Sequence, residues 1–394
     1  MIYVARTHKI RLEVTCKQDL YFRKACGIAR FAWNWALKKY EEKRAIGTKA
    51  TVFDLKKEFN ALKNKEFPWV YEVTKYACQQ PFIHLKRAFQ GFFEKRTAYP
   101  KPKKKGVHDS FYIGGDQLKI EEKCVKIPNL GWVRLKEPLR FAGKINGATV
   151  SRVAGYWFIS VNVETTQLPK PCENQACVGV DLGIKTLAQF SDGGSVANNQ
   201  SLKKHKKKLK RLQRKLSRRQ KGSKNRLKAK KAIAKKHYKV ACMRNDHLHK
   251  LTTLLTERYR HIVIEDLNVS QMLKNRRLSR QIADGAWYEF RRQLSYKAQL
   301  RGNKIFVADK WFASSKRCST CGHVKKELPL AERIYKCDIC FSEMDRDLNA
   351  AICLKQLINT VSSTGIDACG QDGSVIMLKT LSQPAWQKQE LSHV

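Results

Sequence analysis

The chain has 394 residues, enough for two or three domains, and its 79 Lys and Arg residues exceed its 34 Asp and Glu residues to give a formal net charge of +45. Because a compact protein with so much like charge repels itself, the composition favours a polyanionic partner such as nucleic acid. A hydrophobic content of 42% excludes a purely disordered basic tail, and the lack of an apolar run near the roughly 20 residues that span a bilayer excludes a membrane partner.

The N-terminal part of the chain predicts strands that are interrupted by helices. Residues 2–15 alternate apolar and polar side chains, as a half-buried strand does. Apolar residues then recur in steps of three and four, with Pro68 between two helical stretches. After a linker rich in Pro, Lys and Gly, short strands separated by turn residues return. We therefore predict a small β-barrel domain from residues 1–16 and 100–166, with a helical insert at 17–99.

The middle of the chain, residues 176–310, has the pattern of a larger domain. Its strand, strand, helix, strand, helix, strand order predicts a mixed sheet flanked by helices. Residues 202–240 are strongly basic, and no acidic residue occurs between Asp192 and Asp246. This run predicts a helical hairpin that contacts nucleic-acid phosphates, although a solvated charged face is the alternative. The candidate contacts are Lys207, Lys210, Arg211, Arg214 and Arg218.

Three acidic residues lie at or near the ends of predicted elements that are far apart in sequence. Asp181 ends the run CVGVD, Glu265 ends HIVIE, and Asp347 precedes a helix in MDRDLNAA. Strand ends are where open sheets bind ligands, and converging carboxylates are tolerated chiefly when cations neutralise them. We predict that the three hold two Mg²⁺ ions and support phosphodiester hydrolysis. Asp345 competes with Asp347 for the third position, whereas Asp266 is more typical of a cap or turn.

Four of the thirteen cysteines form two C-x-x-C pairs, Cys318 with Cys321 and Cys337 with Cys340. This spacing is typical of a zinc ribbon, which we assign to residues 311–341. Four thiolates leave no open position for water, so the predicted Zn²⁺ is structural. The nine other cysteines occur singly, which indicates reduced thiols in a cytoplasmic compartment.

Several of these segments together resemble the TnpB proteins of bacterial insertion sequences, relatives of small type V CRISPR effectors. The resemblance spans residues 1 to about 358 and is carried by GVDLGIK, HIVIEDLNV, SSKRCSTCGHVKK, YKCDICFSEMDRDLNAA and DGAWYEFRRQLSYKAQLRG. It implies an RNA-guided DNA endonuclease with a RuvC-type, RNase-H-like fold, whose catalytic acids align with Asp181, Glu265 and Asp347. It also implies a guide RNA, a double-stranded DNA target, and a short target-adjacent motif that Lys75 and Gln79 would face.

We therefore expect a multidomain α+β protein. Residues 176–310 and 342–360 would form the RuvC-like domain around the zinc ribbon, next to the β-barrel domain with its helical insert, and residues 361–394 would form a disordered tail. The resemblance further implies a cytoplasmic, nucleoid-associated protein of a bacterium or archaeon. A transposase encoded by the same element would be a further partner in the pathway.

Two other functions fit parts of the pattern. A transposase that joins DNA strands could also use three acids on an RNase-H-like sheet. A non-catalytic nucleic-acid-binding repressor would need only the charge. The presence of all three acids and all four paired cysteines favours a nuclease over that repressor.

Overall fold

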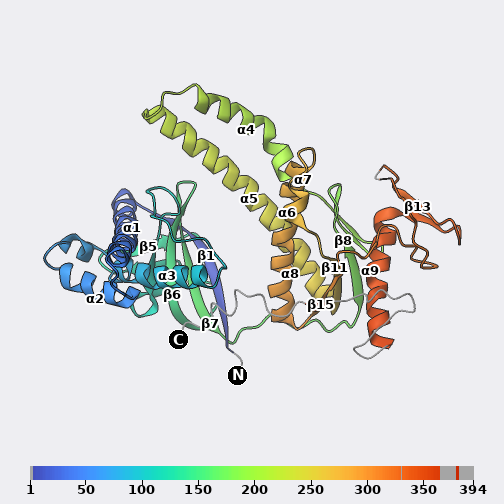
Figure 1. Cartoon of the computed structure of the whole chain (residues 1–394), viewed down its shortest axis with the longest axis horizontal. Coiled ribbons are helices and arrows are strands. Elements are labelled where there is room, and N and C mark those ends of the chain that lie inside the picture. Colours follow the sequence, from blue (N-terminus) through green and yellow to red (C-terminus); the bar gives the residue numbers. More distant parts are fainter. Residues whose placement is uncertain (1–2, 330, 364–378, 381–394) are drawn as a thin grey trace. The chain divides into compact units, whose positions relative to one another are not determined.

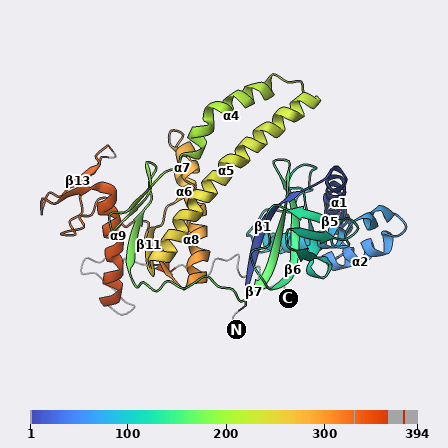
Figure 2. The same ribbon diagram turned by 180° about the vertical axis from the view of Figure 1, so that it is seen from behind.

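The computed structural model describes residues 3–329, 331–363 and 379–380, and the chain divides between Gln167 and Leu168 into two compact units (Figures 1 and 2). The described residues form three sheets and a set of helices, so the expected mixed α+β class is confirmed. Within these residues, no helix combines the length and apolar character needed to cross a bilayer. The two units are described separately below.

The N-terminal unit is built on a seven-stranded antiparallel sheet. The first strand, β1 (Val4–Glu13), lies in the middle of it and pairs with β7 (Tyr156–Thr165) on one side and β5 (Gly131–Leu135) on the other. The chain therefore returns to its own beginning after the helices, as expected. The strand order is β2-β6-β7-β1-β5-β4-β3, and no pairing between the end strands is present in the described residues. The remaining strands are β2 (Ser110–Gly114), β3 (Lys119–Glu121), β4 (Cys124–Ile127) and β6 (Lys144–Val153).

Three α-helices cover this sheet and share its hydrophobic core. They are α1 (Cys16–Ala45), α2 (Val52–Leu62) and α3 (Tyr76–Phe93), with short 3₁₀ turns η1 (Pro68–Glu72) and η2 (Gly115–Gln117). The sequence reading identified the periodicity of α1 and α3 but missed α2. Its signal is a capping box, in which Thr51 and Asp54 bond each other's backbone amides at the helix start.

The C-terminal unit contains a six-stranded mixed sheet in the order β10-β9-β8-β11-β12-β15. The strands β8, β11 and β12 are parallel, and β9, β10 and β15 are antiparallel to their neighbours. Their bounds are β8 (Cys177–Asp181), β9 (Thr186–Phe190), β10 (Ser195–Ala197), β11 (His261–Glu265), β12 (Lys304–Ala308) and β15 (Lys379–Thr380). The predicted mixed sheet with intervening helices is therefore present, with the edge strands β10 and β15 as additions.

Helices lie on both faces of this sheet (Figures 1 and 2). One face packs on α8 (Trp287–Arg301) and on the inner part of α5 (Lys224–Arg258), and the other packs on α9 (Arg346–Ser363). Two short helices, α6 (Val269–Met272) and α7 (Ser279–Gly285), precede α8. A small hairpin of β13 (Ile334–Lys336) and β14 (Glu343–Asp345) lies between β12 and α9 in the chain. The prediction of a disordered tail is wrong for the described part of residues 361–394, because residues 361–363 end α9 and residues 379–380 pair with β12 as β15. The other residues of the predicted tail lie outside the described residues.

The basic run forms a hairpin of α4 (Ser201–Ser217) and α5 that extends away from the sheet (Figure 1). Each helix of the hairpin has a buried apolar residue among its charged neighbours, Leu209 on α4 and Ala229 on α5. Arg226 donates hydrogen bonds to the carbonyl oxygens of Leu216 (3.0 Å) and Arg219 (2.7 Å), which satisfies the end of α4. Helix α5 continues without a break beyond the basic run of residues 202–240 and ends at Arg258. No Gly or Pro occurs within α5, so nothing interrupts the helix where its composition changes.

Candidate active site

Asp181 and Glu265 lie on the same face of the sheet because of the alternation of side chains along a strand. Val178 and Val180 of β8 face the core shared with α5 and α8, which leaves Asp181 on the opposite face. In the parallel neighbour, Ile264 pairs with Val180, and Glu265 follows it as Asp181 follows Val180. The two carboxylates therefore extend from adjacent strand ends toward the side of α9.

Asp347 reaches the same place from the first turn of α9. The approach of α9 to β8 depends on Gly179. A Cβ at this position would overlap the carbonyl oxygen of Ala351 and lie 2.6 Å from the amide nitrogen of Lys355, both in the backbone of α9. A glycine in the strand thus brings the helix, and with it Asp347, close to Asp181.

Each of the other two acids influences the ionisation of Asp181. Burial, followed by the charges of Glu265 and Asp347, raises the pKa of Asp181 well above its usual range. Burial also raises the pKa of Glu265, and a hydrogen bond from the Ser314 hydroxyl opposes this change. A site that penalises its own negative charge in this way is suited to cations. The catalytic role of the three acids stays a prediction.

The neighbouring acids have other contacts. The Asp345 carboxylate accepts hydrogen bonds from the amides of Asp347 (2.9 Å) and Leu348 (3.0 Å), so it caps α9. Asp266 forms an ion pair with Arg291 of α8 at 2.6 Å on the other side of the sheet. Asp345 therefore orients the helix that carries Asp347, and Asp266 acts as an ion-pair partner instead of the predicted cap or turn residue.

The four cysteines Cys318, Cys321, Cys337 and Cys340 converge. Their sulfur atoms all lie within 4.8 Å of one another, and no other group of three or more His, Cys, Asp or Glu side chains among the described residues is as compact. The Sγ atoms of Cys318 and Cys340 are 3.6 Å apart, and those of Cys321 and Cys337 are 3.5 Å apart. A tetrahedral Zn²⁺ with bonds of about 2.3 Å requires sulfurs about 3.8 Å apart, so the donor set and spacing fit zinc.

Polar side chains that sequence reasoning missed join this cysteine cluster to α9. The amide of buried Asn349 donates to the carbonyl oxygen of Arg317 (2.7 Å) and accepts from the amide of Ser319 (2.9 Å). Gln356 donates to the carbonyl oxygen of Ser319 at 2.7 Å. The loop around the first C-x-x-C pair is thus fixed to the helix that presents Asp347. Asn349 is two residues after Asp347 in the DRDLN segment, but the sequence does not indicate its partners.

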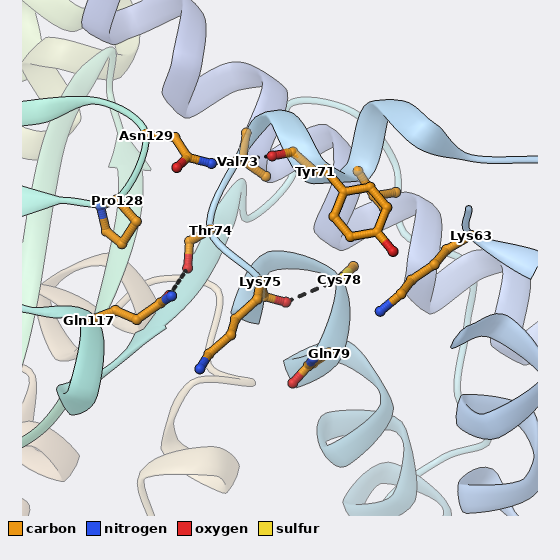
Figure 3. A pocket seen from close by; sticks show the side chains of 11 residues that line it. Lys63, Tyr71, Val73, Thr74, Lys75, Cys78, Gln79, Gln117, Pro128 and Asn129 are labelled. Carbon is orange, nitrogen blue, oxygen red and sulfur yellow. Dashed lines mark hydrogen bonds between the residues drawn. The ribbon is translucent and has the colours of Figure 1, made fainter. Parts of the chain in front are cut away.

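Lys75 and Gln79 lie in the N-terminal unit, where they line a pocket of about 210 Å³ (Figure 3). Lys75 forms an ion pair with Asp116 at 2.9 Å, and Lys63 also lines this pocket. A hydrogen bond of 2.7 Å between Thr74 and Gln117 joins two of its walls. The structure therefore brings the two residues together at a concave surface, and their contact with DNA stays a prediction.

The five candidate cations of the basic hairpin are all exposed on α4 or at its end. They are Lys207, Lys210, Arg211, Arg214 and Arg218. None forms an ion pair with a described acidic residue, so their charges are available to a polyanion.

Comparisons with known proteins agree with this arrangement. Family models match residues 158–276 (OrfB_IS605, "Probable transposase"), residues 287–354 ("Cas12f1-like, TNB domain") and residues 1–49 ("Helix-turn-helix domain"). In the structure, residues 4–45 form a strand and one long helix instead of a helix-turn-helix.

Two relatives cover most of the chain. "Putative RNA-guided DNA endonuclease InsQ" of Escherichia coli (strain K12) is 35% identical over 87% of this chain and 90% of its own length. A "Putative RNA-guided DNA endonuclease" of Streptomyces pristinaespiralis is 36% identical over 89% of each chain. The chain therefore belongs to the TnpB/OrfB_IS605 family.

A solved structure shares the fold. "Cryo-EM structure of the Cas12f1-sgRNA-target DNA complex" matches with a TM-score of 0.55 and 14% identity, over 90% of this chain and 99% of that chain. At this identity the likeness concerns the fold alone.

Proposed function

We propose that this chain is an RNA-guided DNA endonuclease whose active site consists of Asp181, Glu265 and Asp347. The observation that carries the proposal is the convergence of three carboxylates from two adjacent strand ends and one helix start. Burial, followed by the charges of Glu265 and Asp347, raises the pKa of Asp181 there. The relatives in E. coli and S. pristinaespiralis, whose names describe this activity, support it.

Each side chain has a definable part in the chemistry. Two Mg²⁺ ions bound by the carboxylates would supply an activated water and stabilise the leaving 3′ oxygen of a phosphodiester. Ser314 holds one oxygen of Glu265 and so fixes the carboxylate's orientation. Asp345 and Asn349 hold the first turn of α9, which sets the position of Asp347. Such positioning matters because small misplacements of reacting groups greatly slow a reaction.

The rest of the proposal assigns roles to the remaining parts of the chain. The sheet of the C-terminal unit would be the RuvC-like, RNase-H-like domain, the cysteine cluster a zinc ribbon, and the N-terminal sheet the β-barrel with its helical insert. The exposed hairpin cations would contact phosphates of a guide RNA paired with DNA, whose sequence is read by base pairing. Lys75 and Gln79 would face the duplex beside the target. A transposase of the same element would act in the same pathway, in the cytoplasm of a bacterium or archaeon where RNA and DNA meet.

The test uses the full chain together with the RNA that copurifies with it. Asp181→Ala is expected to slow Mg²⁺-dependent cleavage of a matching DNA by roughly a thousandfold or more, with RNA binding unchanged. Asp246→Ala is the matched control, because Asp246 is an exposed acid of the same unit, paired with Lys250 on α5. Cleavage retained in Asp181→Ala, or lost equally in both variants, would contradict the assignment.

A strand-transfer transposase is the second candidate, and the match of residues 158–276 to the "Probable transposase" family model favours it. It would also need the three carboxylates. Incubating the RNA-free protein with transposon-end DNA and Mg²⁺ discriminates the two: joined DNA products support the transposase, and cleavage that requires the copurified RNA supports the endonuclease.

A further inference from the structure

A second pocket of the C-terminal unit lies at the base of the hairpin, between α4 and α7, and has a volume of about 360 Å³. We call it the α4–α7 pocket. Its walls come from the loop after β8, the loop before α4, the first turns of α4, and α7 with the residues before it. Its basic lining residues are Lys185, Lys203, Lys206, Arg277 and Arg280.

The charge of this pocket is strongly positive. Five basic side chains line it, and among the described residues none of them forms an ion pair with an acid. The single acid, Asp284, is buried and already committed, since it accepts hydrogen bonds from Arg244 (3.0 Å) and from the amide of Leu202 (2.9 Å). Five cations around one cavity repel one another until an anion enters.

The walls are held in place before any ligand binds. Asn198 donates to the carbonyl oxygen of Ile184 (2.9 Å) and accepts from the amide of Gln200 (3.1 Å), which fixes two of the loops to each other. Asp284 fixes α7 to the start of α4 and to α5. Preorganised cationic groups of this kind bind an anion without a large ordering penalty.

Two features indicate which anion fits. Lys206 is followed directly by Lys207 on the exposed face of α4, so the pocket continues the basic surface of the hairpin. Ile184 is only three residues after Asp181, which limits the separation of their Cα atoms to about 11 Å. The pocket therefore borders both the basic surface of the hairpin and the loop that begins at Asp181, so that one phosphodiester strand is long enough to contact both. Arg277 and Arg280 offer the planar donors that bind phosphate with two hydrogen bonds.

We propose that the α4–α7 pocket binds a backbone phosphate of the DNA strand that is cut, and thereby sets the position of that strand at Asp181. The inference rests on the proposed function and adds a substrate-positioning site to it. The same phosphodiester chemistry occurs in the guide RNA, and the experiment separates these two sources.

The test compares Arg277→Gln/Arg280→Gln with the matched control Lys274→Gln/Arg276→Gln. All four residues are exposed and close in sequence, both variants lose two charges, and only the first pair lines the pocket. The probe is a fluorescein-labelled single-stranded DNA in buffer without divalent cations, so binding is read independently of cleavage. The pocket variant should bind severalfold more weakly, with a salt dependence shallower by about 1 to 2 in log K against log[salt]. The control should match the wild type, and all three proteins should copurify with equal RNA.

A second experiment identifies the individual phosphate by replacing one charged phosphodiester of the DNA with an uncharged methylphosphonate. DNA strands complementary to the sequenced copurified RNA are prepared with a single methylphosphonate at successive positions and bound to the RNA-loaded proteins. One position should weaken binding to the wild type and to the control but not to Arg277→Gln/Arg280→Gln, because the lost contacts are the same. A position effect that persists in the pocket variant, or reduced copurifying RNA in that variant alone, would overturn the proposal. If DNA binding proves independent of the RNA sequence, the proposed function fails, while the salt dependence still reports on the pocket.

Discussion

Asp181 is a carboxylate whose folded environment opposes its charge. Burial and two neighbouring acids raise its pKa, whereas an ordinary carboxylate is fully ionised at neutral pH. The contribution of such a group to stability is present at low pH and is lost as the pH rises through the raised folded-state pKa. At the residue scale, the candidate site is therefore a place where function and stability conflict.

This conflict gives a prediction for Asp181→Asn measured without divalent cations. Asparagine has nearly the same shape but no charge, so the variant should be more stable than the wild type at pH 7.5. Each 1 kcal/mol of difference corresponds to an increase of roughly 2–4 °C in Tm. The gap should shrink at pH 5, because a lower pH favours the neutral form of a carboxyl whose pKa is raised. Thermal unfolding at the two pH values measures this; an equal or lower Tm for the variant at pH 7.5 would show that the carboxylate is not under repulsion.

At the scale of elements, the sequence predicts what a local pattern determines. Asp181 and Glu265 could be found because each ends an apolar strand, and the cysteine cluster because its ligands are paired at fixed spacing. Ser314 and Asn349 could not be assigned, because their partners lie 49 and up to 32 positions away in sequence. Helix α2 was missed although its capping box is a local signal. The length of α5 could have been predicted from the lack of Gly and Pro between residues 224 and 258.

The packing of α9 on β8 is the element contact on which the site depends, and Gly179→Ala tests it. The added methyl group would collide with backbone atoms of α9, which cannot turn aside as a flexible side chain can. We expect a loss of about 1–3 kcal/mol in the free energy of unfolding, measured by urea denaturation, and a larger proportional loss of cleavage because Asp347 moves with α9.

Gly27→Ala is the control for that prediction. Gly27 lies inside α1, where a Cβ would meet nothing closer than the Arg30 guanidinium at 3.8 Å. Alanine should stabilise this helix by about 0.5–1 kcal/mol. Normal stability and cleavage in Gly179→Ala would show that α9 approaches β8 less closely than described here.

At the scale of the whole molecule, helix α9 joins the cysteine cluster to the carboxylates, because it carries Asp347 and forms hydrogen bonds with the loop around Cys318. Cys337→Ser should release one zinc per chain, measured by atomic emission, because a site with three thiolates binds more weakly. Loosening of the Arg317–Ser319 loop removes the partners of Asn349 and Gln356, so cleavage should fall although no carboxylate is altered. Cys242→Ser is the control, since Cys242 is exposed and distant in sequence from the cluster. Full cleavage after zinc loss would mean that α9 holds its position without the cluster.

The net charge of +45 attracts nucleic acid as a whole, whereas only cations in contact with phosphates determine the salt dependence of binding. If the hairpin contacts phosphates, replacing its five exposed cations by Gln should make the salt dependence of nucleic-acid binding shallower by up to about 4 or 5 in log K against log[salt]. A charge-matched variant in the N-terminal unit, with Lys38, Arg44, Lys49, Lys57 and Lys65 replaced by Gln, loses the same total charge. Filter binding over a range of KCl concentrations measures both slopes. Counterions are released only where phosphates are neutralised at close range. A shallower slope in the hairpin variant alone would therefore identify the hairpin as a surface along which the nucleic acid lies. Equal slopes in the two variants would show that the hairpin contributes only general electrostatic attraction.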